Sequence, residues 1–166
     1  MKTALIISII ILSLFGVELE PNKLYEGGLK LTTKSLGVSF YLPPNWRGSV
    51  QLGKPFIMTH EKKLGYMRAE RARIDTVVDE MLKDQDYNEE ITFKSLNKPK
   101  RLRSTLYRIN YRGRGIYRNY QGIGYIVLGP QDRVIKVFGV FKEENKTMMD
   151  NTMLRFVRSI SFTTLY

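Results

Sequence analysis

Short stretches of alternating apolar and polar residues run through most of the chain, and this pattern is typical of β-strands. Between residues 36 and 42 every second position is apolar, and Pro43-Pro44 then ends the stretch because proline has no backbone N–H to donate to a neighbouring strand. Shorter or less regular patterns of the same kind predict further strands at 50–52, 56–60 and 64–72. The first half of the chain is therefore expected to form mainly β-structure.

A meander of three strands is predicted further along the chain, over 102–112, 115–128 and 133–141. Gly113-Arg114-Gly115 is expected to make a tight hairpin between the first two, since glycine tolerates positive φ, and residues 129–132 make the second turn. The third strand is apolar at odd and even positions alike. A strand buried on both faces needs one layer of structure above it and another below it.

Two helices are predicted to supply part of those layers. The first covers 75–83, where Thr76 and Asp79 form a start that resembles a capping box. The second lies between Glu143 and Ser159, and its apolar residues form one stripe: Met149, Met153, Phe156, Val157 and Ile160. A short final strand or tail follows. These elements predict an α+β fold, with an antiparallel sheet of about six strands and helices packed on its faces.

The N-terminal residues have the pattern of a signal peptide. Lys2 gives a short positive start, the run from Ala4 to Val17 carries no charge, and acidic residues together with Pro21 end it sharply. This run is too short to cross a bilayer comfortably. We therefore expect a signal peptide at 1–16, an N-terminal arm at 17–35, a single α+β domain at 36–166, and a periplasmic or secreted location. Leu14 breaks the usual small-residue cleavage pattern, so an uncleaved N-terminal membrane anchor is the alternative.

The composition excludes several classes of site. The chain has no cysteine, which excludes disulfides, thiolate metal sites and cysteine nucleophiles. Its only histidine, His60, excludes a metal site built from several histidines. The Gly-x-Ser-x-Gly motif is absent, and the acidic residues at 79–86 match no calcium-binding loop. We expect no metal, no cofactor and no catalytic residue.

The charge is strongly positive, +11 with a pI of about 9.8, which points either to anionic partners or simply to solubility. No Asp or Glu occurs between Ile91 and Gln131, where lysines and arginines are interleaved with tyrosines. Arginine matches phosphate, sulfate and carboxylate groups, and tyrosine adds an amphipathic contact surface. The candidate anion-binding residues are Arg108, Arg112, Arg114, Arg118, Tyr111 and Tyr117. The alternative is a solvated strand face whose arginines pair with the acidic stretch from Asp75 to Glu90.

Two short motifs, Phe40 to Trp46 and Phe156 to Phe162, resemble the PsbP/Mog-type superfamily. Residues 40–46 read Phe-Tyr-Leu-Pro-Pro-Asn-Trp, similar to its F-x-x-P-x-x-W opening, and residues 156–162 resemble its closing helix and I-x-F ending. The resemblance implies an α/β/α sandwich around an antiparallel sheet. The superfamily includes extrinsic photosystem subunits, a nuclear-import cofactor and exported bacterial proteins, which mostly bind and assist rather than catalyse. No site motif is matched, so the resemblance assigns no functional residue.

Two functions of different class follow as expectations. The first is an exported, non-enzymatic binding or assembly module of the cell envelope, whose basic Tyr/Arg-rich hairpin face contacts an anionic envelope component, such as lipopolysaccharide or phospholipid, or an acidic protein surface. A nucleic-acid partner is not expected for an exported protein, and anchoring in the membrane is expected only through an uncleaved N-terminus. The second is a secreted hydrolase or toxin-like effector with an unrecognised site near His60. Arginines gathered on one exposed face favour the first, and a deep pocket with His60 beside a carboxylate favours the second.

Overall fold

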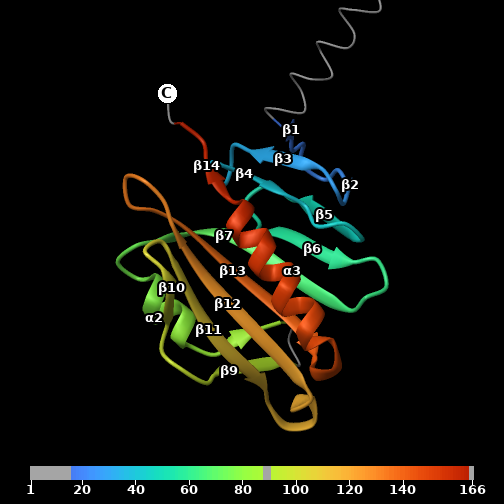
Figure 1. Ribbon diagram of the computed structural model, residues 1–166, viewed down its shortest axis with the longest axis vertical. Coiled ribbons are helices and arrows are strands. Elements are labelled where there is room, and N and C mark those ends of the chain that lie inside the picture. Colours follow the sequence, from blue (N-terminus) through green and yellow to red (C-terminus); the bar gives the residue numbers. More distant parts are fainter. Residues whose placement is uncertain (1–15, 88–90, 165–166) are drawn as a thin grey trace, which may run out of the picture.

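A long, twisted antiparallel sheet forms the centre of the computed structural model, which describes residues 16–87 and 91–164 (Figure 1). Its strands follow the order β2-β5-β6-β7-β13-β12-β11-β9-β8, and β10 pairs with β11 beside β9. The strands of this sheet are β2 (Tyr25–Glu26), β5 (Trp46–Val50), β6 (Phe56–His60), β7 (Gly65–Arg73), β8 (Gln85–Asp86), β9 (Thr92–Ser95), β10 (Lys100–Arg103), β11 (Leu106–Gly113), β12 (Tyr120–Leu128) and β13 (Arg133–Lys142).

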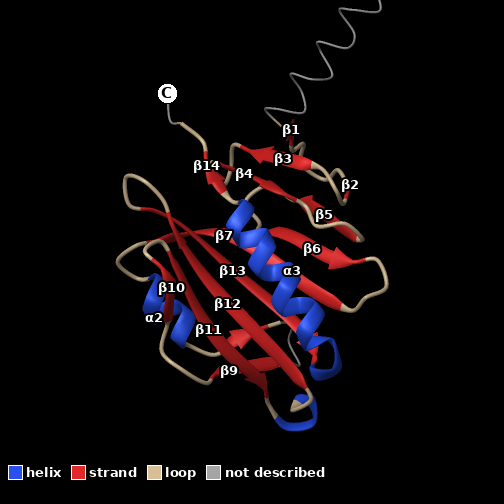
Figure 2. Ribbon diagram, in the orientation of Figure 1, coloured by secondary structure: helices blue, strands red, loops and turns tan. Residues whose placement is uncertain are grey.

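A second, smaller sheet lies at one end of the first and has the strand order β1-β3-β4-β14 (Figure 2). Its strands are β1 (Val17–Glu18), β3 (Lys30–Thr33), β4 (Val38–Tyr41) and β14 (Ser161–Phe162). The helical elements are α2 (Val77–Leu82), α3 (Lys146–Ser159) and the short 3-10 turns η1 (Gly115–Tyr117) and η2 (Glu143–Asn145). β14 pairs with β4, so the end of the described chain joins a sheet whose other strands come from residues 17–41.

The strand β13 separates two hydrophobic cores, as its apolar pattern predicts. Ile135 and Val137 belong to the core under α3, whereas Val134 and Phe138 belong to the core that contains residues of α2. Successive side chains of a strand point to opposite faces, so the two helices cover opposite faces of β13. The expectation of an antiparallel sheet is confirmed. The count of about six strands is wrong, because the sheet is longer and a second sheet is present.

The helix α3 confirms the predicted apolar stripe except at Ile160, which follows the helix and is only half-buried. Met149, Met153, Phe156 and Val157 are all buried against the sheet. Glycines make room for the two methionines: a Cβ on Gly65 would meet Met149, and a Cβ on Gly139 would meet Met153. Because these glycines lie on β7 and β13, the helix packs close to the middle of the sheet.

The segment expected as a loose N-terminal arm is instead part of both sheets. Residues 17–35 contain β1, β2 and β3, and Leu31 is completely buried. Tyr25 is buried too, and its hydroxyl accepts a hydrogen bond from the Glu20 backbone N–H at 2.8 Å. The polar composition of this segment concealed a short alternating strand, because Thr33 occupies an inward-facing position of β3.

The tight hairpin expected at Gly113-Arg114-Gly115 is also wrong. β11 ends at Gly113, the turn η1 follows, and β12 begins only at Tyr120. The wider connection is held by its own backbone, since the Tyr117 N–H donates to the Arg114 carbonyl at 3.1 Å. The strand predicted over 102–112 is in fact two strands, β10 and β11, which fold on each other around residues 104 and 105.

Tyrosines removed from solvent make the free energy of unfolding depend on pH in the alkaline range. Burial raises the pKa of the Tyr111 phenol above its ordinary value, and it raises the pKa of Tyr66 and Tyr125 in the same direction. The neutral phenols therefore contribute stability that is complete below about pH 10, the value in unfolded chains, and is lost as the pH rises towards the folded values. Above about pH 10 we expect the fully buried Tyr111 alone to lower the free energy of unfolding by up to about 1.4 kcal/mol per pH unit.

Denaturant titrations between pH 8 and pH 11 measure this dependence. The Tyr111→Phe variant should have a shallower slope, because one buried phenol no longer ionises on unfolding. It should also be less stable at pH 8, because the Tyr111 hydroxyl donates to the Met81 carbonyl in the wild type. If the variant shows the same dependence of unfolding free energy on pH as the wild type, Tyr111 does not contribute to the alkaline loss of stability.

The predicted signal peptide at 1–16 lies almost wholly outside the described residues, where only Gly16 is included. Among the helices of residues 16–87 and 91–164, none has the length and apolar character needed to span a bilayer.

Candidate functional site

The candidate arginines of the basic segment do not form one free face. Arg108 points from β11 towards α3, where its Nη2 contacts the Asp150 carboxylate at 2.7 Å and its Nε donates to the Asn110 side chain at 2.9 Å. Arg114 forms an ion pair with Asp84 at 2.7 Å. Two of the four candidate arginines are thus compensated by carboxylates, and Arg114 pairs with the acidic stretch as the solvated-face alternative predicted.

The remaining candidates have different environments. Arg112 and Arg118 are exposed, and within the described part of the chain neither takes part in an ion pair. Tyr111 is fully buried and belongs to the core next to α2. Tyr117 is half-buried, with its ring 5.9 Å from the ring of Tyr120. The turn η1 places Arg118 outside the paired strand on which it was expected.

The other sequence candidate, His60, is a packed strand residue. Its side chain is 9% exposed and its ring meets Trp46 edge-on, with 5.5 Å between the ring centres. The Nδ1 atom accepts a hydrogen bond from the Lys62 backbone N–H at 3.1 Å. Among residues 16–87 and 91–164 no carboxylate forms a hydrogen bond or ion pair with His60, and no group of three His, Asp or Glu residues could hold a metal ion.

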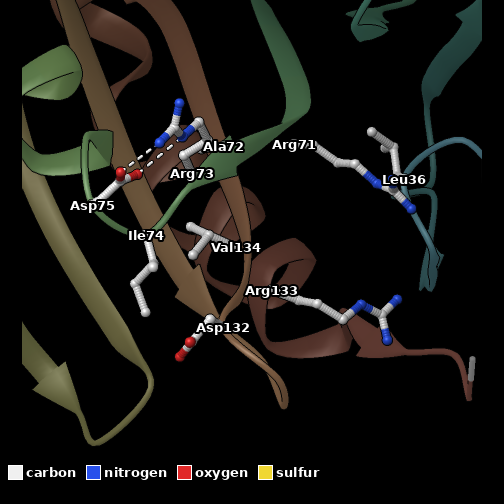
Figure 3. A pocket seen from close by; sticks show the side chains of 9 residues that line it. All are labelled: Leu36, Arg71, Ala72, Arg73, Ile74, Asp75, Asp132, Arg133 and Val134. Carbon is white, nitrogen blue, oxygen red and sulfur yellow. Dashed lines mark hydrogen bonds and ion pairs between the residues drawn. The ribbon is translucent and has the colours of Figure 1, made fainter.

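A cavity of about 580 Å³ opens where the large sheet meets the small one (Figure 3). It is formed by the end of β7, the start of β13 and the turn between β3 and β4. Its residues are Leu36, Arg71, Ala72, Arg73, Ile74, Asp75, Asp132, Arg133 and Val134. Ile74, Val134 and Leu36 give it an apolar lining, and three guanidinium groups give it positive charge.

Arg133 is held in place from several sides. Its Nη1 donates to the Thr163 carbonyl at 2.6 Å, and its Nη2 donates to the Gly37 carbonyl. The guanidinium carbon lies 5.1 Å from the centre of the Phe162 ring. These contacts tie the β3–β4 turn to the C-terminal segment and fix the direction of the Arg133 side chain.

The Arg71 guanidinium reaches the same place. Gly37 has a φ of 67°, and a Cβ at this position would collide with the Arg133 guanidinium and lie 3.0 Å from the Arg71 Nη2. In Figure 3 both arginines extend to the same side of the cavity, away from Arg73 and Asp75, and Arg71 ends beside Leu36. The absence of a side chain on Gly37 therefore gives space for two cationic groups to converge.

The charges of the cavity do not cancel. Asp75 binds Arg73 through two hydrogen bonds of 2.6 and 3.1 Å, and this contact lowers the pKa of the Asp75 carboxyl. Asp132 is exposed on the neighbouring turn. Within the described residues, no carboxylate forms an ion pair with Arg71 or Arg133. The arrangement attracts anions, because two like charges close together raise the local potential.

Sequence reasoning missed this site. Arg71 and Arg133 are far apart in the chain, and they meet because β7 and β13 pair in a register that places Arg73 opposite Arg133. The available signal was that each arginine stands at the end of a predicted strand. Which strands are neighbours, and in which register, could not be read from one sequence.

The structure is similar to the solution structure of cyanobacterial PsbP (CyanoP) from Synechocystis sp. PCC 6803. The TM-score is 0.53 at 12% sequence identity, and the match covers 84% of this chain and 91% of that chain. Searches of family models and of curated proteins find no match. The chain therefore has a PsbP-like fold, which confirms the resemblance seen in the two short motifs.

Proposed function

We propose that the protein is an exported, non-enzymatic binding or assembly module that holds an anionic group of its partner in the cavity at Arg71 and Arg133. The convergence of these two guanidinium groups over Gly37 carries the proposal. A carboxylate or phosphate placed between them would relieve their mutual repulsion. It would also accept charge-assisted hydrogen bonds, which are stronger than bonds between neutral groups.

The chemistry of the lining favours binding over catalysis. Its polar side chains are arginines and aspartates, and it contains no histidine, serine, threonine or lysine. A guanidinium stays protonated at any physiological pH, so it serves as a fixed donor and not as a base. Export is proposed from the N-terminal sequence pattern, and a periplasmic or secreted location would bring the cavity to anionic envelope components or acidic protein surfaces.

The Arg71→Gln variant tests the proposal. Arg71 is exposed, so its replacement should leave the fold intact, whereas Arg133 also holds two backbone carbonyls. We expect the variant to bind pyrophosphate and a hexaglutamate peptide roughly tenfold more weakly than the wild type, by isothermal titration calorimetry at low salt. The two probes distinguish a phosphate-bearing partner from a carboxylate-bearing one.

Arg103→Gln is the matched control. It removes the same charge from an exposed position on β10, outside the cavity. Equal losses in both variants would show that affinity follows net charge alone, and an unchanged Arg71→Gln variant would show that the cavity binds neither probe. Either result contradicts the proposed site.

A further inference from the structure

The connection between β11 and β12 presents an isolated apolar side chain at one extremity of the large sheet. We call residues 114–119 the η1 tip; it closes the end of the sheet opposite the β12–β13 turn (Figure 1). Ile116 is 85% exposed there, although isoleucine is among the residues most often buried in proteins. At this exposure its side chain buries little surface within the fold, so packing does not account for its presence.

Cationic and aromatic residues flank Ile116 along the chain, on the η1 tip and on the adjoining ends of β11 and β12. Arg112 and Arg118 are exposed and form no ion pair within the described chain, and Arg114 remains about half exposed beside Asp84. The half-buried rings of Tyr117 and Tyr120 pack against each other at the base of the tip. Among the described residues, the carboxylates near the tip are Asp84, Asp86, Glu143 and Glu144, which belong to the α2–β8 segment and to η2 and not to the tip itself.

The tip keeps its shape without a partner. The Arg114 N–H donates to the Thr92 carbonyl at 3.2 Å, and the Arg118 N–H donates to the Gly115 carbonyl at 3.3 Å. The Glu143 N–H donates to the Asn119 carbonyl at 2.9 Å, which fixes the far side of the tip to η2. Docking therefore needs little ordering of the backbone, and the entropy cost of binding stays low.

We propose that the η1 tip docks on an anionic lipid surface, with Ile116 inserted at the level of the acyl chains and headgroups. Arginines contact lipid phosphates while their stems lie along apolar surface, and tyrosine rings favour the boundary between water and hydrocarbon. A bilayer that contains anionic lipids attracts basic groups held within a Debye length of its surface, about 8 Å at physiological ionic strength. An acidic protein is the alternative occupant, and the vesicle experiments below distinguish it from a lipid surface.

The chain contains a matched site that should not dock. Leu52 is 87% exposed on the turn between β5 and β6, so it is as accessible as Ile116. Its neighbours on the turn are Gln51, Gly53 and Lys54, without arginine or tyrosine. Exposure alone therefore does not distinguish the two positions, and the surrounding charge and aromatic rings do.

A tryptophan placed at each position reports insertion. We expect Ile116→Trp to shift its fluorescence to the blue on vesicles of phosphatidylcholine with phosphatidylglycerol, but not on phosphatidylcholine alone. Leu52→Trp should show no shift on either. The native Trp46 is 1% exposed and gives a constant background. Quenching by brominated acyl chains then measures the depth of residue 116.

Vesicle sedimentation of variants measures how much the two arginines and Ile116 each contribute to lipid binding. Arg112→Gln with Arg118→Gln should lower partition onto anionic vesicles about 25-fold, since each basic residue near such a surface contributes about fivefold. Ile116→Gln should lower it roughly tenfold. Three results would overturn the proposal: binding without a blue shift at position 116, equal shifts at positions 116 and 52, or no binding to anionic vesicles at low salt. The last result would leave the tip as a surface for an acidic protein. The cavity test uses soluble probes and Arg71, so the two proposals fail independently.

Discussion

We expect the Phe156→Ala variant to lose about 3–5 kcal/mol of unfolding free energy, the usual cost of removing a large aromatic side chain from a core. Phe156 is 1% exposed and joins α3 to the small sheet, because its ring meets Phe40 edge-on with 5.2 Å between the ring centres. Phe40 in turn lies 5.0 Å from Phe56 of the large sheet. A cavity at position 156 would therefore weaken the contact among three structural elements.

Denaturant titration followed by circular dichroism measures this loss. The neighbouring Arg155→Ala variant is the control, since Arg155 is exposed on the same helix and alanine preserves helical propensity. A loss below about 1 kcal/mol for Phe156→Ala would mean that α3 can separate from the sheets without much loss of stability.

The adjacent glycines Gly27 and Gly28 should respond to alanine by different amounts. A Cβ on Gly27 would overlap the Pro43 carbonyl and lie 2.9 Å from the Trp46 carbonyl oxygen, and both obstacles are backbone. We expect Gly27→Ala to cost about 3 kcal/mol or more, at the upper end of the usual cost of overpacking. Gly28 has open space around its Cα but a φ of 85°, so Gly28→Ala should cost only about 1 kcal/mol through backbone strain.

The pair of variants is its own control, because each adds one methyl group to the same turn. Thermal unfolding of both variants in parallel gives the difference directly. A Gly27→Ala variant as stable as Gly28→Ala would show that the 43–46 segment moves aside easily, although buried Leu42 and Trp46 hold its two ends.

Strands and helices whose apolar residues recur at regular spacing could be predicted from the sequence. β6, β7, β13 and α3 lie where periodicity placed them, since each is long or regular enough for apolar residues to mark one face or both. The two-residue strands β1, β2 and β8 could not be found in this way. Their conformation depends on pairing with strands distant in the chain, such as β1 with β3 and β2 with β5.

The candidate site could be predicted from the sequence to a smaller extent than the fold. The sequence shows which residues are cationic, and it directed attention to the segment with the greatest density of arginine. Whether a given arginine is compensated depends on tertiary contacts, as Asp150 on α3 compensates Arg108 from 42 positions away. Arg71 stands in a less conspicuous context, yet it is one of the arginines that no described carboxylate pairs with.

The length of β13 has a thermodynamic consequence for the two proposed binding regions. The strand runs from Arg133, beside the cavity, to Lys142, which pairs with Tyr120 at the base of the η1 tip. Ten residues of antiparallel strand span about 30 Å, several times the distance over which physiological salt screens exposed charges. Occupation of one region should leave the affinity of the other unchanged, so the molecule can act as a rigid spacer that holds an anionic partner at a set height above a lipid surface.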